Sequence, residues 1–134
     1  MSTSYSGQGI NLGNLIADVD MNSHQFKFVT TASTAGSFKL ATGGSGPAPL
    51  GVLQDDPRAG EPGNIRVFGT SKVSASGAIG FGDFVVAGSH GLAVVQTAAS
   101  AAVQGVALTA LASGGGYVEV LLTPLAVFST DNTP

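Results

Sequence analysis

The most chemically suggestive stretch of the chain is a run of alternating oxygen-bearing side chains near its start. Asp18, Asp20 and Asn22 have the opening spacing of a calcium-binding loop, in which oxygen ligands recur at alternate positions. The sixth position of such a loop needs a sharp turn and is normally glycine, but here it is Ser23. The twelfth should be a bidentate glutamate and is Val29. We therefore interpret the run as a polar turn before a strand, and we expect no metal site.

Two histidines, His24 and His90, are the side chains that could act as a general base or bind a metal near neutral pH. Each falls at the end of an expected strand or at the tip of an expected hairpin. The chain has many serines, but none lies in a Gly-x-Ser-x-Gly turn, which strains and exposes a nucleophile. We interpret both histidines as solvated turn residues and predict that the protein is not an enzyme.

Two further sequence features resemble acid–base or phosphate-binding sites but are better explained as turns. Asp55 and Asp56 are adjacent, so an extended backbone sends their carboxylates to opposite sides and they cannot work as a paired acid and base. We expect them to form a turn with Pro57. The glycine clusters at residues 43–46 and 114–116 lack the Lys-Ser/Thr of a phosphate-binding loop, and no convincing helix follows either of them. No cofactor is expected.

The composition argues against several classes of partner. Of 134 residues, 5 are Lys or Arg and 8 are Asp or Glu, which gives a formal net charge of −3. Nucleic acid binding is not expected, because the basic residues are scattered and a groove that follows phosphates needs them clustered. The chain has no cysteine and so has no disulfide framework, thiolate nucleophile or cysteine-based zinc site. With few charges to keep copies apart, we expect the protein to pack against neighbouring protein.

The sequence predicts neither a membrane span nor secretion. Its start has no basic segment followed by an apolar stretch, as a secretory signal would. The longest weakly charged stretch, residues 98–112, is too short and too often interrupted by polar residues to span a bilayer. We expect a soluble protein that is made in the cytoplasm.

Alternation of apolar and polar residues predicts a succession of short strands. Residues 24–29 alternate with period two, which puts Phe26 and Phe28 on one face and Lys27 on the other. Residues 37–41 repeat the pattern and complete a hairpin. Further strands are expected at residues 51–54, 64–73, 84–87, 92–96, 104–108 and 117–122. Gly69 is expected to mark a bulge or bend. The seven phenylalanines are expected to point mostly into the core, which explains them without a base-stacking role.

The order of these segments indicates an internal repeat. Three segments of the first part are echoed in the second: Leu40-Ala41, Gly51-Val52-Leu53 and Ile65-Arg66-Val67 by Val94-Val95, Gly105-Val106-Ala107 and Val118-Glu119-Val120. The sequence thus predicts an all-β fold, either a compact β-sandwich or a partly open barrel, with an internal pseudo-repeat. Alanine and leucine in residues 98–112 also favour helix, so one short helical turn at residues 98–102 stays open as an alternative.

The ends of the chain differ from its middle. Residues 1–14 are rich in Ser, Gly, Gln and Asn, and such a segment cannot offset its ordering entropy by burial. We predict a flexible N-terminal arm at residues 1–14, a single β-rich domain at residues 15–123 and a C-terminal tail at residues 124–134. Within the arm, Tyr5, Ile10 and Leu12 are spaced so that they could grip a neighbouring protein.

Five short motifs follow one another in a distinctive order. They are Gly51-Val52-Leu53 before a turn, a turn that ends in Ala59-Gly60-Glu61, a strand that ends in Gly69, a Gly82-Asp83 turn, and Gly105-Val106 before the last strand. Each motif is common alone. In this order and spacing, over residues 26–122, they resemble the capsid cement, or head decoration, proteins of tailed bacteriophages. No catalytic residue is carried over.

The resemblance implies a compact β-rich domain that forms homotrimers on the outer surface of an icosahedral head. There it would bridge neighbouring subunits of the major capsid protein after the shell expands and resist the pressure of the internal DNA. The arm would add a strand to an exposed sheet edge of a capsid subunit, because main-chain pairing gives affinity without particular side chains.

Two alternative functions share this composition and lack of chemistry. One is another structural phage β-domain, associated with a tail or a fibre. The other is a carbohydrate-binding surface module, which is disfavoured because such a site usually needs exposed aromatic platforms. The chain has no Trp, and its tyrosines are Tyr5 and Tyr117.

Overall fold

The computed structural model describes residues 8–43, 47–97 and 103–123, and these residues form an all-β fold. Ten strands make one sheet that is not closed into a barrel: β1 (Gly9–Leu12), β2 (Ile16–Ala17), β3 (Phe28–Thr31), β4 (Ser37–Leu40), β5 (Gly51–Leu53), β6 (Ile65–Ser74), β7 (Phe84–Ala87), β8 (Ala93–Val95), β9 (Gly105–Ala107) and β10 (Tyr117–Leu122). A 3-10 turn, η2 (Ser89–Gly91), joins β7 to β8. The all-β prediction is confirmed. The helical alternative at residues 98–102 lies outside the described residues.

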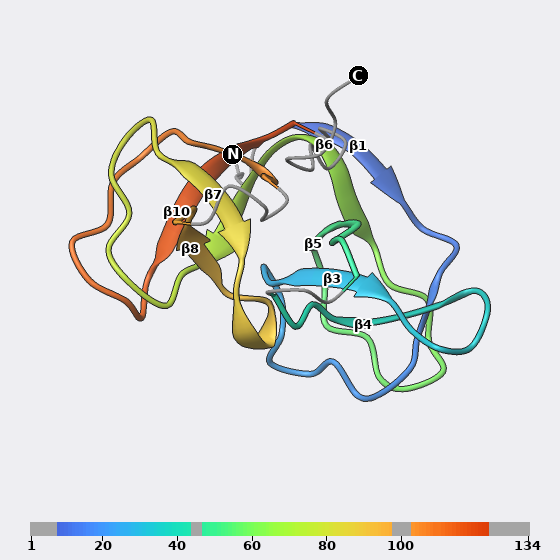
Figure 1. Cartoon of the computed structure of the whole chain (residues 1–134). Coiled ribbons are helices and arrows are strands. Elements are labelled where there is room, and N and C mark those ends of the chain that lie inside the picture. The colour runs from blue at the N-terminus through green and yellow to red at the C-terminus, as the bar shows by residue number, and fades with distance from the viewer. Residues whose placement is uncertain (1–7, 44–46, 98–102, 124–134) are drawn as a thin grey trace, which may run out of the picture.

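The strand order shows that the sheet consists of two similar units. It runs β2-β4-β3-β5-β6-β10-β9-β7-β8, and β1 also pairs with β6. We call β3, β4, β5 and β6 the first unit and β7, β8, β9 and β10 the second unit. The order β4-β3-β5-β6 recurs as β8-β7-β9-β10, and the units meet at the antiparallel pair of β6 and β10. Figure 1 shows β7, β8 and β10 at one end of the molecule and β3, β4 and β5 at the other. The described ranges contain no helix long and apolar enough to cross a membrane.

The register of the strand pairs confirms the internal repeat and corrects its alignment. Gly51 lies opposite Val29 as Gly105 lies opposite Val85, so the two Gly-Val segments are equivalent, as predicted. The flanking segments differ from the predicted alignment. Leu40 corresponds to Val95, because these residues lie opposite Val29 and Val85, and not to Val94. Ile65 likewise corresponds to Val120, opposite Leu53 and Ala107, and not to Val118. The loops between equivalent strands differ in length by one residue, which direct comparison of the letters does not reveal.

The repeat produces two equivalent rows of residues that lie opposite one another across three neighbouring strands. Directly opposed residues of an antiparallel pair share one face of the sheet. We call the row of the first unit the covered row and that of the second unit the open row: Phe28, Val52 and Arg66 on β3, β5 and β6, and Phe84, Val106 and Leu121 on β7, β9 and β10.

A close approach of two strands explains why both Gly-Val segments begin with glycine. A Cβ atom added to Gly51 would lie 2.2 Å from the carbonyl oxygen of Arg66, and one added to Gly105 would lie 2.2 Å from that of Leu121. A real Cβ cannot come so close to a backbone oxygen, so a larger residue would push the strands apart. The two units therefore share a steric requirement as well as a register.

The two units differ in how they are buried. Neighbouring residues on a strand point to opposite faces, and in β3 and β5 both faces are buried. Val29 and Leu53 belong to a core with Ala17, Met21, Phe38 and Ile65. Phe28 and Val52 belong to a second core that also contains Val85, Ala107 and Val120 from the second unit. The first unit is thus a layer between two cores, whereas Phe84 on the opposite face of the second unit is 55% exposed.

The segment before β3 departs from the predicted strand. β3 begins at Phe28, and residues 25–27 before it form a turn followed by a bend. Phe26 has a φ of +67°, its N–H donates to the Leu53 carbonyl, and its own carbonyl accepts from the Ser74 N–H. The prediction that Phe26 and Phe28 share one face of a strand is wrong. The alternating pattern is present in the sequence, but Phe26 bridges two other strands and so cannot continue β3.

Gly69 lies at an irregular point of the long strand β6, as the sequence predicts. Its φ is +112°, and an added Cβ would lie 2.0 Å from the carbonyl oxygen of Gln8. The pairing of β1 with β6 shifts register nearby, because Ile10 lies opposite Phe68 but Asn11 lies opposite Arg66. β6 can therefore pair with β1 and β5 along its first part and with β10 along its second.

Candidate interaction surfaces

The run of oxygen-bearing side chains near residue 20 forms a turn. The Asn22 N–H donates to Asp20 Oδ1 at 3.0 Å, and the Met21 side chain between them is fully buried. An aspartate that bonds the backbone two residues ahead is a common way to stabilise a turn. Within the part of the chain that the structure describes, no group of three or more His, Cys, Asp or Glu side chains is placed to hold a metal ion.

The surroundings of His24, which include a nearby lysine, favour the neutral form of its ring. Lys27 Nζ lies 3.0 Å from His24 Nδ1, and an ammonium group can only donate, so the proton of the neutral ring is placed on Nε2. Burial lowers the pKa of His24 below 6.5, and the positive charges of Lys27 and His90 lower it further, while Asp20 opposes them. The charge of His90, which lies in η2 between β7 and β8, thus acts on His24 in the turn before β3.

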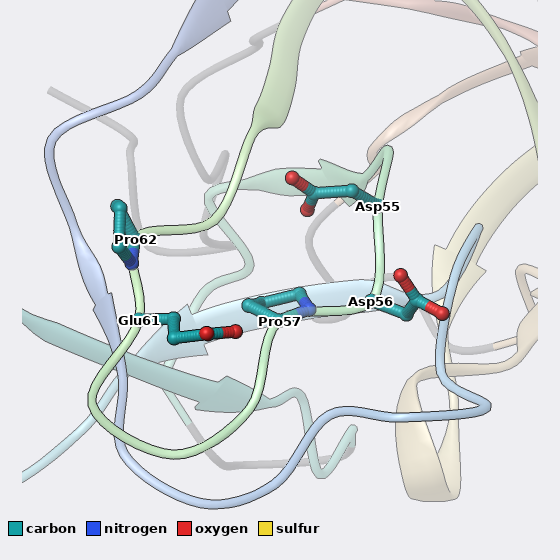
Figure 2. Close-up of a pocket in the computed structure, with 5 residues that line it drawn as sticks. All are labelled: Asp55, Asp56, Pro57, Glu61 and Pro62. Carbon is teal, nitrogen blue, oxygen red and sulfur yellow. The ribbon is translucent and has the colours of Figure 1, made fainter.

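Acidic side chains line an open hollow at the turn after β5, but they serve the turn itself. The hollow has a volume of about 360 Å³ and is lined by Asp55, Asp56, Pro57, Glu61 and Pro62. The carboxylates of Asp55 and Asp56 point to opposite sides (Figure 2), as their adjacency predicts. Asp55 Oδ1 accepts from the Asn64 N–H at 3.1 Å, and Glu61 Oε1 accepts from the Arg58 N–H at 2.9 Å. These carboxylates thus stabilise the loop between β5 and β6.

The phenylalanines are less buried than the sequence predicts. Phe28 and Phe38 are fully buried, but Phe68, Phe81 and Phe84 are 50%, 76% and 55% exposed. The prediction that these rings point mostly inward is therefore wrong for half of the six that the structure describes. Strand alternation fixes that Phe84 and Val85 face opposite ways, but it does not say which face another layer covers.

One apolar surface lies where β1 pairs with β6. Ile10 is opposite Phe68, and their side chains are 61% and 50% exposed; Leu12 at the end of β1 is 36% exposed. We call Ile10, Leu12 and Phe68 the arm surface. Arg66 fixes the strand beside it, because its Nε donates to Asn11 Oδ1 at 2.7 Å and its Nη1 donates to the Thr70 carbonyl at 2.9 Å. Of the predicted contact residues, Ile10 and Leu12 lie on β1, and Tyr5 lies outside the described residues.

A second apolar surface is the open row. Phe84 is 55% exposed, Leu121 is 38% exposed, and Val106 between them is half-buried. The alternation of apolar and polar residues does not reveal this surface. The signal that could have found it is the repeat itself, because the register matches Phe84 and Val106 to Phe28 and Val52, which are fully buried. The equivalent residues of the second unit can be buried to the same extent only if another layer packs on their face of the sheet.

An aromatic contact joins the turn before β3 to the second unit. The rings of Phe26 and Tyr117 meet edge to face with centroids 5.8 Å apart. Lys72 Nζ lies 4.9 Å from the centroid of Phe26 and 5.2 Å from that of Tyr117, close enough for cation–π attraction. Lys72 is also opposite Glu119 across the β6–β10 pair. The Tyr117 ring thus already has partners within this chain.

Comparison with known proteins gives one family and one fold. A family model described as phage cement protein matches residues 6–122. Among solved structures, the chain is similar to the head fiber gp8.5 N base of bacteriophage phi29, with a TM-score of 0.66. The two are 18% identical, and the match covers 86% of this chain and 94% of that one. At that identity the likeness shows a shared fold. A comparison with curated protein sequences finds no match.

Proposed function

This chain belongs to the phage cement protein family, which makes it a structural protein of the virion, and we propose that it decorates the outer surface of a phage head. In this proposal it binds the major capsid protein, forms a homotrimer and stabilises contacts between neighbouring capsid subunits. The observation that carries the proposal is the family match over residues 6–122, which includes every strand of the sheet. The low charge and the two exposed apolar surfaces support it, because such surfaces are typical of proteins that pack against other proteins.

The arm surface is the proposed contact with the capsid. All four residues of β1 are exposed, and within the described residues β1 pairs with β6 alone, so its other edge has no strand partner there. An edge of this kind can accept or extend a strand of another protein through main-chain hydrogen bonds. Ile10 and Leu12, together with Tyr5, would then pack against that partner. Many equivalent contacts of modest strength around a shell would add up to firm attachment.

Truncation of the arm tests the capsid contact. Removing residues 1–13 deletes β1 and should strongly reduce the number of copies bound per head and the heat resistance of the particle. Ile10→Ser is the milder variant and should lower occupancy while it leaves the fold intact, because this side chain is 61% exposed. Val19→Ser is a matched control, since Val19 is 51% exposed in the loop after β2 and so lies outside β1. Unchanged occupancy and heat resistance after the truncation would exclude the arm as the contact.

The fold likeness to a head fiber base supports a second candidate, in which this domain anchors a fibre to the particle. Cryo-electron microscopy of the native particle separates the two functions. A decoration protein covers the head at many equivalent positions as a density with threefold symmetry, whereas a fibre base lies beneath a projecting fibre. A strictly dimeric density would contradict the proposed homotrimer.

A further inference from the structure

The open row is a continuous apolar surface in which no member carries a charge or a polar group. Phe84 lies opposite Val106 and Val106 lies opposite Leu121, so three side chains from β7, β9 and β10 follow one another on one face. Leu108 extends the row, because it lies two residues beyond Val106 and is 37% exposed. In a protein that is separate from others, such a surface is costly in water.

The covered row shows how this chain buries such a surface elsewhere. Phe28 and Val52 occupy the same register positions as Phe84 and Val106, and both are fully buried. They lie in the core that contains Val85, Ala107 and Val120 of the second unit. The covered row is therefore buried against the second unit of its own chain. Among the described residues, no third unit covers the open row in the same way.

The third position strengthens the contrast between the rows. In the covered row it is Arg66, whose guanidinium bonds Asn11 and Thr70, and in the open row it is Leu121. The row that no other described segment covers is thus the more apolar of the two. Beside it, Glu119 lies two residues before Leu121 on β10, opposite Lys72 on β6. An apolar centre with a charged margin is the usual anatomy of a protein interface, and interfaces between identical chains have the more apolar centres.

From these observations we propose that the open row is the surface on which a second copy of this chain packs. The inference deepens the proposed function and rests on it, because copies placed side by side on a head are the partners that such a surface would meet. It assigns the arm surface and the open row to different neighbours: the capsid contacts Ile10 and Phe68, and another copy contacts Phe84 and Leu121. Self-association can then be tested without a capsid.

Sedimentation equilibrium of the full chain tests the proposal. The unmodified protein should associate as its concentration rises, and Phe84→Ser should weaken that association at least about ten-fold, since a large aromatic residue often dominates an interface. Phe68→Ser is the matched control, because Phe68 is 50% exposed against 55% for Phe84, and it should leave association unchanged. A protein that stays monomeric at high concentration, or a Phe84→Ser variant that associates as well as the unmodified chain, would overturn the proposal.

A cysteine probe gives a second measurement that does not depend on weakening the interface. The chain has no cysteine, so Phe84→Cys and Phe68→Cys each introduce a unique thiol. The thiol at position 84 should react more slowly with a maleimide as the protein concentration rises, and the thiol at position 68 should not. Equal rates at both positions and all concentrations would contradict the proposal. Loss of capsid binding in the arm variants would leave these results unaffected, so failure of the proposed function can be told apart from failure of this inference.

Discussion

The first and second units have the same strand order and the same register, but they bury their side chains differently. Both units place glycine opposite a buried valine and an apolar residue next to it, as Gly51 and Val52 or Gly105 and Val106 do. Yet Val52 is fully buried and Val106 is half-buried, because the second unit covers the first and no described segment covers the second. Strand pairing therefore follows from the residues of each unit, whereas burial of a face depends on which other part of the protein packs against it.

The same comparison separates residues that the backbone requires from residues that the environment selects. Gly51 and Gly105 are identical because each faces a carbonyl oxygen at a distance that no Cβ tolerates. Arg66 and Leu121 supply those oxygens, and their side chains differ completely because only their backbones take part in the close approach. The residue types of the two units are thus most similar where main-chain atoms are in close contact, and they differ where side chains are exposed.

Truncation of the two equivalent phenylalanines should give the largest difference between the units. Phe28→Ala removes a fully buried ring from the core between the units and should lower the free energy of unfolding by about 3–5 kcal/mol. Phe84→Ala should change it by about 0.5 kcal/mol or less, because that ring is 55% exposed. Urea unfolding of dilute protein measures both values.

Protein concentration sharpens this test. If copies pack through the open row, concentrated protein gains stability by mass action, and Phe84→Ala should lose that gain while Phe28→Ala keeps it. Equal losses of stability for the two variants in dilute solution would show that the covered and open rows do not differ as described.

The glycines should show the opposite behaviour, with equal effects in both units. Gly51→Ala and Gly105→Ala each force a methyl group against a backbone oxygen, so each should cost about 1–3 kcal/mol of unfolding free energy. Gly77→Ala is the control, since a Cβ there would meet nothing within 4 Å. Thermal and urea unfolding of the three variants would measure the costs. A large loss at one glycine and none at the other would mean that the repeat is not a steric equivalence.

The pattern of residues predicted most of the strands because their alternation and their turns are local properties. β4, β5, β9 and β10 lie in the expected ranges for that reason, and the family resemblance used the same short motifs. Two kinds of feature could not be predicted. Phe26 takes a left-handed backbone to bond Leu53 and Ser74, which are distant in sequence. The exposure of Phe84 depends on whether another layer packs on its face of the sheet, which the alternation along one strand does not determine.

The candidate interaction surfaces were accessible to sequence reasoning only in part. Ile10 and Leu12 were found because a polar arm makes its few apolar residues conspicuous. The predicted arm at residues 1–14 remains a prediction as a functional unit, although the structure places Ile10 and Leu12 in a strand paired with β6. The open row cannot be recognised in this way, because its residues have the pattern of core residues. The repeat that reveals it is aligned correctly only by the strand register.

The Lys72 contact is a smaller effect that joins the units at their surface. Lys72→Gln keeps a long polar side chain but removes the cation that lies over the Phe26 and Tyr117 rings. It should lower the free energy of unfolding by about 0.5–1 kcal/mol, as expected for cation–π attraction at an exposed site. A double-mutant cycle with Tyr117→Leu isolates the interaction between the two side chains. A coupling energy of zero would show that the units are held together here by strand pairing alone.

The smallest expected effect is a pH dependence that also crosses between the units. Because the pKa of His24 is lower in the folded protein than its ordinary value of 6.5, the unfolded chain binds more protons as the pH falls through 6.5. Stability should therefore decline on the acidic side of that value, as protonation ends the acceptance from Lys27 and adds a charge beside it. His24→Gln should flatten the decline measured by urea unfolding between about pH 7 and about pH 5, where carboxylates are still mostly ionised. His90→Gln should flatten it less, because His90 of the second unit is the weakest of the causes that lower the pKa of His24. An unchanged pH profile in His24→Gln would assign the acid sensitivity to other groups and remove this link between the two units.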